Sequence, residues 1–358
     1  MTQTKYLPSD SSWITCYFWI FLICLLLLIA ENARGAELNV SRNQLPVSLG
    51  PYLDHFEDPD RTLTIEDILA GDLPWERSTQ NIPTLGMSGS AHWFHINLKG
   101  ENLGDESLLL SLEAPVLDRV EFYFVRNNEL VRTSIAGDTI PYSALDYPYR
   151  FPVILFNAGS TRMDIQIYLR ATSGGGVEIP LKLTTLPELS TQQQAHQAFL
   201  GALFALFIVC LVVCAGIYTF TKDKNLIGTL MFFGGAILFF LGQTGMGRVW
   251  FWGETSEFNT RVSMLAANIL VASICKIGIS LDYKMPGKKL LKQILRGCAW
   301  LMLPAALFYS MAPFSAIGAS TVAPMMIIAF LIAIAVLLTA GITALQGSRA
   351  AVYLFFPC

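Results

Sequence analysis

The chain has 358 residues, of which 53% are hydrophobic and only 14% are charged, and its formal net charge is −3. Soluble domains carry roughly 25% charged residues, so this composition excludes a protein made of soluble domains alone. The slightly acidic balance also argues against nucleic acid as a partner, because phosphate binding needs a basic surface.

The N-terminus carries an apolar run from Trp13 to Ala30, followed by small residues. Residues 33–35 (Ala-Arg-Gly) fit a small-x-small cleavage pattern. We interpret residues 1–36 as a signal peptide or, because the run is long for one, as an uncleaved N-terminal anchor. Either segment would deliver the residues that follow it across a membrane.

Residues 37–190 alternate apolar and polar side chains with a period of two, as half-buried antiparallel strands do. Turn-forming residues separate the alternating runs, and one short helix is predicted from Ile65 to Ala70, between Thr64 and Gly71. None of the seven cysteines lies between residues 37 and 197, so this domain is expected to lack a disulfide. The pattern predicts an all-β sandwich of jelly-roll type.

Residues with metal or catalytic chemistry are sparse in this domain. His92 and His95 invite a metal interpretation, but residues three apart on a strand face opposite sides of the sheet. Glu66 and Asp67 fall in the first turn of the predicted helix, where negative charge suits the helix dipole. We therefore expect no metal site, no cofactor and no catalytic residues.

The segment 141–152 is the best candidate for a ligand site. Aromatic faces can stack on a sugar ring while polar groups bind its hydroxyls. The alternative is that the segment packs as a long loop between strands or faces the bilayer surface. The candidate ligand residues are Tyr142, Asp146, Tyr147, Tyr149 and Arg150.

The second half of the chain is predicted to be a helical membrane bundle over residues 198–358. Residues 191–197 form a polar linker without Gly or Pro, which favours a helical lead-in to the first span. About 20 apolar residues cross the hydrocarbon layer as a helix. Such segments occur at 198–220, 226–246, 261–281, 298–317 and 321–345, and a sixth begins at 350. The sixth is too short to cross before Cys358, so we expect that the bundle is incomplete.

Charge in the loops predicts the orientation. The loops 221–225, 282–297 and 346–349 hold eight basic residues, which places them in the cytoplasm and residues 37–197 outside. The opposite loop, 247–259, has an interfacial aromatic cluster in Trp250, Phe251 and Trp252. The basic residues are Lys222, Lys224, Lys284, Lys288, Lys289, Lys292, Arg296 and Arg349.

The complete predicted spans contain no acidic residue, although a proton-coupled or ion-coupled transporter usually needs one. Transport is therefore disfavoured. Asn268 lies in the middle of a predicted span and is expected to hydrogen-bond a neighbouring helix rather than a substrate.

Several short motifs in both halves resemble those of bacterial seven-transmembrane receptors with diverse intracellular signalling modules, the DISM receptors. Each motif is weak alone, but their order over most of the chain is specific. In the first half they are Gly50-Pro-Tyr-Leu-Asp54, Leu63-Thr-Ile-Glu-Asp67, His92-Trp-Phe-His-Ile-Asn-Leu98, Leu117-Asp-Arg-Val-Glu-Phe-Tyr123, Gly137-Asp138, Phe151-Pro152, Ile167-Tyr-Leu-Arg170 and Val177-Glu-Ile-Pro-Leu181. In the second half they are Lys222-Asp-Lys-Asn-Leu226 and Thr244-Gly-Met-Gly-Arg-Val-Trp250.

The resemblance implies a periplasmic sensor similar to carbohydrate-binding modules, seven spans in the bacterial inner membrane, and a cytoplasmic output module such as a kinase or cyclase. This sequence departs from the family where it stops, so the output module is expected to be missing and no enzyme activity is expected. The implied ligand is a small periplasmic molecule, plausibly a carbohydrate, and the sequence leaves a homodimer open. The alternatives are a membrane scaffold or accessory subunit that binds a periplasmic protein and, less favoured, a transporter.

Overall fold

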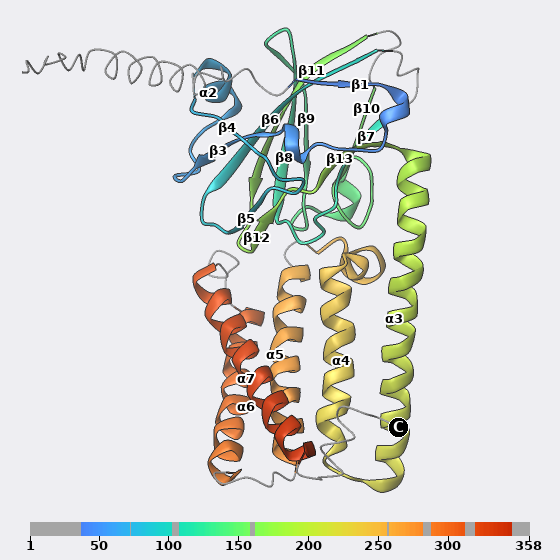
Figure 1. Cartoon of the computed structure of the whole chain (residues 1–358), viewed down its shortest axis with the longest axis vertical. Helices are drawn as coiled ribbons and strands as arrows, with labels where there is room; N and C mark the ends of the chain where they lie inside the picture. Colours follow the sequence, from blue (N-terminus) through green and yellow to red (C-terminus); the bar gives the residue numbers. More distant parts are fainter. Residues whose placement is uncertain are drawn as a thin grey trace, which may run out of the picture. The chain divides into compact units, whose positions relative to one another are not determined.

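A computed structural model describes residues 37–71, 73–101, 107–157, 162–255, 258–281, 288–311 and 319–345. Figure 1 shows a β-sandwich followed by a set of long helices, which confirms the predicted fold class. The predicted signal or anchor segment, 1–36, and the start of a sixth span at 350 lie outside the described residues.

The larger sheet has the strand order β4-β3-β6-β11-β8-β9, and β1 pairs with β6 as a seventh strand. The pairing of β1 with β6 is parallel, and the other pairings in this sheet are antiparallel. Its strands are β1 (Glu37–Val40), β3 (Asp54–Asp58), β4 (Glu76–Arg77), β6 (Ala91–Glu101), β8 (Arg119–Arg126), β9 (Glu129–Ala136) and β11 (Arg162–Thr172).

The second sheet has the order β10-β7-β13-β2, and β12 pairs with β5 as a separate ribbon. These strands are β2 (Val47–Ser48), β5 (Thr84–Met87), β7 (Ser107–Leu112), β10 (Val153–Asn157), β12 (Gly176–Glu178) and β13 (Leu181–Thr185). Short 3₁₀ turns, η1 (Arg42–Gln44), η2 (Gly50–Tyr52) and η3 (Tyr142–Ala144), lie in the connections.

The core of the sandwich follows from the period-two alternation. Phe94, Phe122 and Ile167 come from neighbouring strands of the larger sheet and are fully buried against Leu110 and Leu183 of the second sheet. The residues between them in sequence point to the other face of their sheet. The larger sheet therefore has an outer face, which is partly covered by a smaller apolar cluster around Trp93.

The short helix α2 (Ile65–Ala70) covers part of that outer face and matches its predicted bounds. The side chain of Thr64 accepts a hydrogen bond from the backbone N–H of Asp67, and the Asp67 carboxylate accepts one from the backbone N–H of Thr64. This reciprocal capping box satisfies two backbone donors that the first turn would otherwise leave unpaired. Asp67 thus has the structural role that the sequence predicted.

The helical part begins directly after β13. Four described helices are long and apolar enough to cross a membrane. The apolar stretch of α7, Ile327–Thr339, is shorter. Neighbours in contact are α3 with α4, α4 with α5, α5 with α6, and α5 with α7. The helices are α3 (Leu186–Thr221), α4 (Leu226–Gln243), α5 (Phe258–Ser280), α6 (Lys288–Met311) and α7 (Ala319–Leu345), with a π-helical turn η4 (Arg248–Trp252) between α4 and α5.

Two helices begin earlier than the apolar segments predicted. Helix α3 starts at Leu186, so the polar linker 191–197 is part of one continuous helix. Helix α6 starts at Lys288 rather than at residue 298, because its basic first turns are also good helix formers. Hydropathy indicates where a helix enters the hydrocarbon layer, and it does not indicate the first residue of the helix.

Replacing Phe122 by alanine should lower the free energy of unfolding of the sandwich by about 3–5 kcal/mol, because its ring is fully buried between the sheets. The control is Val131→Ala on the neighbouring strand β9, where the side chain is 61% exposed and a change within about 0.5 kcal/mol is expected. Urea unfolding of the full chain in detergent, followed by tryptophan fluorescence, measures both. Equal losses in the two variants would contradict the described core.

Candidate functional site

The first part of the predicted ligand segment contacts the π-helical turn η4. The backbone N–H of Tyr142 donates to the Gly253 carbonyl at 2.8 Å. Ser143 donates to the Glu254 carboxylate twice, from its backbone N–H at 3.1 Å and from its hydroxyl at 2.6 Å. The loop between β9 and β10 is therefore bonded to the connection between α4 and α5.

Arg150, at the other end of the segment, contacts two helices. Its side chain is largely buried, and the guanidinium donates to the Thr244 carbonyl at 3.2 Å and to the side chain of Gln193 in α3. Thr244 is the C-cap of α4, where the last carbonyls of a helix lack partners within it. A cation at this end also complements the negative end of the helix dipole.

The remaining predicted ligand residues divide between two places. Tyr147 and Tyr149 have ring centroids 6.3 Å apart and pack beside Phe151 and Leu189 of α3. Asp146 instead accepts a hydrogen bond from Arg132 of β9 at 2.6 Å. The structure thus brings Tyr147, Tyr149 and Arg150 together against α3 and places Tyr142 and Asp146 elsewhere. Their role in ligand binding stays a prediction.

Asp138 makes a further contact between the sandwich and the helices. It is 3% exposed and lies just beyond the end of β9. Its Oδ2 accepts hydrogen bonds from Asn259 Nδ2 at 3.2 Å and from Thr260 Oγ1 at 3.5 Å, in the first turn of α5. The Asn259 Oδ1 in turn accepts from the Trp252 indole N–H at 3.1 Å.

Burial and the nearby Asp118 carboxylate raise the pKa of Asp138 from its ordinary 3.8 to about 7, although Asn259 and Arg248 act in the opposite direction. The folded protein therefore favours the protonated form more than the unfolded chain does. The resulting contribution to stability is present below pH about 4 and is lost as the pH rises through about 7.

Close backbone approach completes this junction. Gly245 has φ = +73°, and a Cβ at this position would lie 2.2 Å from the Arg150 carbonyl oxygen. Both the left-handed backbone and the contact require glycine. Nearby, the buried Arg248 guanidinium donates to the Ile140 carbonyl of the β9–β10 loop. We call the contacts of the β9–β10 loop with α3, α4, η4 and α5 the junction.

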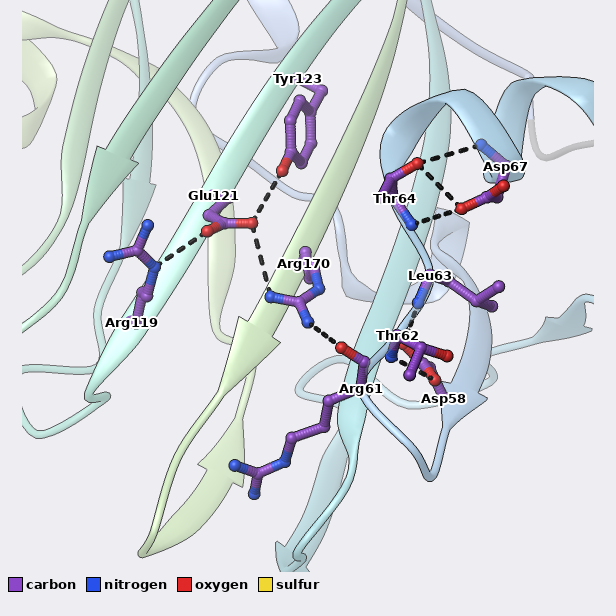
Figure 2. A network of polar contacts seen from close by, with 10 residues as sticks. All are labelled: Asp58, Arg61, Thr62, Leu63, Thr64, Asp67, Arg119, Glu121, Tyr123 and Arg170. Atoms are coloured by element: carbon purple, nitrogen blue, oxygen red, sulfur yellow. Dashed lines mark hydrogen bonds and ion pairs between the residues drawn. The ribbon is translucent and has the colours of Figure 1, made fainter. Parts of the chain in front are cut away.

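A second polar cluster lies on the outer face of the larger sheet, as Figure 2 shows. The Glu121 carboxylate accepts hydrogen bonds from Arg119 Nε at 2.9 Å and from the Tyr123 hydroxyl at 2.7 Å. Arg170, on the adjacent strand β11, lies 3.6 Å from Glu121 and donates to the Arg61 carbonyl at 3.0 Å. This cluster connects two central strands to the loop that leads into α2.

A shallow hollow of about 470 Å³ opens beside this cluster. Its lining combines charged groups, hydroxyls and one aromatic ring with three aliphatic side chains: Arg61, Thr62, Leu63, Thr64, Ile65, Glu66, Glu121, Tyr123, Leu130, Thr133 and Arg170. Burial and the hydrogen bond to Glu121 raise the pKa of Tyr123, so its phenol stays a neutral donor. Such a surface can exchange its internal hydrogen bonds for those of a polar ligand. We call it the outer-face hollow.

The histidines of β6 occupy opposite faces, as predicted. The rings of His92 and His55 share one face, with His55 Nε2 and His92 Nδ1 3.1 Å apart, whereas His95 stacks on Tyr168 on the other. Burial lowers the pKa of all three histidines, which favours neutral rings. Within the described ranges, no three His, Cys, Asp or Glu side chains are grouped as metal ligands would be.

The sequence analysis did not identify the main polar residues of the junction or of the outer-face hollow as site residues. Asp138 entered the sequence analysis only as part of the motif Gly137-Asp138, and its partner Asn259 is 121 positions away, so no local signal joins them. A signal did exist for the outer-face hollow. Glu121 and Tyr123 are two apart on a strand and must share a face.

Comparison with known proteins gives two matches that follow the division into sandwich and helices. The family model described as 7TMR-DISM extracellular 2 matches residues 50–185, and the model described as 7TM diverse intracellular signalling matches residues 196–356. Comparison with curated proteins gives no match. The two matches follow one another along the chain and together cover most of it. The chain therefore belongs to the 7TM receptors with diverse intracellular signalling, as a multi-pass membrane protein with an extracellular sensor domain.

Proposed function

We propose that the sandwich binds a small, hydroxyl-rich periplasmic ligand, such as a carbohydrate, and that binding shifts the ends of α4 and α5 in the bacterial inner membrane. An output module on the cytoplasmic side would then respond to the helices. The observation that carries the proposal is the junction, where the β9–β10 loop is bonded to the C-terminal end of α4 and the first turn of α5.

The outer-face hollow is the ligand site that we favour. Glu121 offers acceptor oxygens, Arg170 and Arg61 offer donors, and the threonine hydroxyls offer both. Opposite charges compensate one another within the cluster, which suits a neutral ligand with many hydroxyls better than a strongly charged one. The hollow is open rather than enclosed, so a sugar would bind by exchanging hydrogen bonds more than by burying apolar surface.

A short path through one strand pairing connects this hollow to the junction. Glu121 of β8 is paired directly with Ile135 of β9, and Asp138 follows three residues later. A ligand that changes the position of Glu121 would act on strand β9, which ends two residues before Asp138. The size of the shift is limited by the difference in ligand affinity between the two states of the receptor.

A scaffold that binds a periplasmic protein is the second candidate. Strand β9 lies at the edge of the larger sheet and exposes Leu130 and Val131, at 43% and 61%. Edge strands can add a strand from a partner. A stoichiometric periplasmic partner that is lost in a Val131→Asp variant but retained in Glu121→Gln would favour the scaffold over the sensor.

We expect Glu121→Gln to weaken binding of the responding sugar at least tenfold, because the amide removes the charge that orders Arg119, Arg170 and the Tyr123 hydroxyl. The control is Glu129→Gln, which makes the same change at an exposed position of β9. Thermal shift and calorimetry of the full chain in nanodiscs, with a panel of mono- and disaccharides, measure the effect. Binding that survives Glu121→Gln but is lost in Tyr147→Phe would move the site to the β9–β10 loop.

Gly245→Ala should leave sugar affinity nearly unchanged and abolish its effect on the helices. The added Cβ would displace the Arg150 carbonyl and open the junction, which lies away from the hollow. The control is Gly216→Ala in α3, where a Cβ meets no atom within 4 Å. Hydrogen exchange of residues 244–260, with and without sugar, reports the coupling. A sugar response of equal size in Gly245→Ala would refute the proposed relay.

A further inference from the structure

A cavity of about 470 Å³ lies at the junction, apart from the outer-face hollow. Its walls come from the segment before β8, the loop before β12, and the first turns of α5. Its apolar wall includes Met87, Pro115, Leu117 and Met264. Cavities of a few hundred Å³ with apolar walls and a few polar groups are typical small-molecule sites.

Two buried polar atoms in the lining lack a hydrogen-bond partner. Asp138 is 3% exposed and Ser263 is 4% exposed, and both line the cavity. Asp138 Oδ1 and Ser263 Oγ have no partner, although Asp138 Oδ2 is bonded to Asn259 and Thr260. Buried carboxylate oxygens are normally hydrogen-bonded, so Oδ1 is suited to a donor from a bound molecule.

The charge of the cavity lining indicates which kind of hydrogen-bond donor the bound molecule carries. Glu113, Asp118, Asp138 and Glu178 line the cavity, and none of the described lining residues is basic. Lys182 lies 2.9 Å from Glu113 and offsets that carboxylate, and Arg248 acts on Asp138 from outside the lining, so the four carboxylates still outnumber these two basic groups. A neutral polyol would satisfy Oδ1 but not this charge, whereas an ammonium group satisfies both.

A metal ion fits less well than an organic cation. Among the residues that the structure describes, no group of three acidic, histidine or cysteine side chains is arranged to hold a metal. The methionine, proline and leucine side chains of the cavity wall can pack against an aliphatic chain. A bare ion would leave these side chains uncovered.

We propose that the junction cavity binds a small aliphatic amine, whose ammonium group donates to Asp138 and whose hydrocarbon chain packs on the apolar wall. The sandwich and α5 both contribute to this wall, so the amine binds best when the junction is closed. The cavity is an effector site separate from the sugar site, and an amine can bind there whether or not a sugar is bound in the outer-face hollow.

Titration of the full chain in phosphatidylcholine nanodiscs with butylamine, by calorimetry, tests the site. Asp138→Asn should weaken binding at least tenfold, because the amide loses the charge and keeps the shape. Asp164→Asn, at an exposed position of β11, is the matched control and should bind as the unmodified chain does. Ser263→Ala should weaken binding two- to fivefold. Unchanged affinity in Asp138→Asn would overturn the proposal.

The pH profile of the unmodified chain gives a readout that needs no variant. The pKa of Asp138 of about 7 means that a proton competes with the amine, so affinity should rise about tenfold between pH 6 and pH 8. The charged groups that act on Asp138 are Asp118 and Arg248, and α5 contributes the neutral Asn259 and Thr260. Arg248 stays charged between pH 6 and pH 8, so the change in amine affinity is due to titration of the carboxylates.

Two further probes separate the alternatives. Tetramethylammonium carries the charge but no N–H, and it should bind at least fivefold more weakly than butylamine. Sorbitol carries donors but no charge and should not bind measurably at this site. If sorbitol binds as tightly as butylamine with no pH dependence, the cavity is a neutral polyol site and the amine proposal fails.

Discussion

The structure depends on how the sandwich contacts the polar groups at the helix ends. Helix α4 ends and helix α5 begins at the junction, and a helix leaves its last carbonyls and its first N–H groups without partners inside the helix. The sandwich supplies a cation to the first helix and a carboxyl group to the second. Arg150 donates to the Thr244 carbonyl, and Asp138 accepts from the side chains of Asn259 and Thr260 in the first turn of α5. Each charge is placed where the helix dipole favours it.

This arrangement explains why the β9–β10 loop carries three tyrosines and Arg150. Burying Arg150 requires hydrogen-bond acceptors and apolar cover, and the loop supplies Phe151, 4.9 Å from the guanidinium, with Tyr149 beside it. The same residue types make good sugar sites, because both tasks need flat apolar surface beside strong donors. Composition alone does not separate a ligand site from an interface, and the contacts here favour the interface.

The sequence was sufficient to predict the parts that depend on local periodicity. Alternation predicted the strands, Thr64 and Gly71 marked the ends of helix α2, and hydropathy located the long helices. It failed where the cause is distant in sequence. The Asn268 amide donates to the Met264 carbonyl within α5, and its expected bond to a neighbouring helix stays a prediction. No pattern near residue 138 indicated a partner at the start of α5.

Two ligand sites on one sensor domain would have to influence each other. An amine in the junction cavity stabilises the closed junction, because its site is built from both the sandwich and α5. If sugar binding at Glu121 opens or closes that junction, the amine changes the sugar affinity by some factor. Linkage then requires the sugar to change the amine affinity by the same factor. The direct pairing of Glu121 with Ile135, close to Asp138, is the physical basis for a coupling of measurable size.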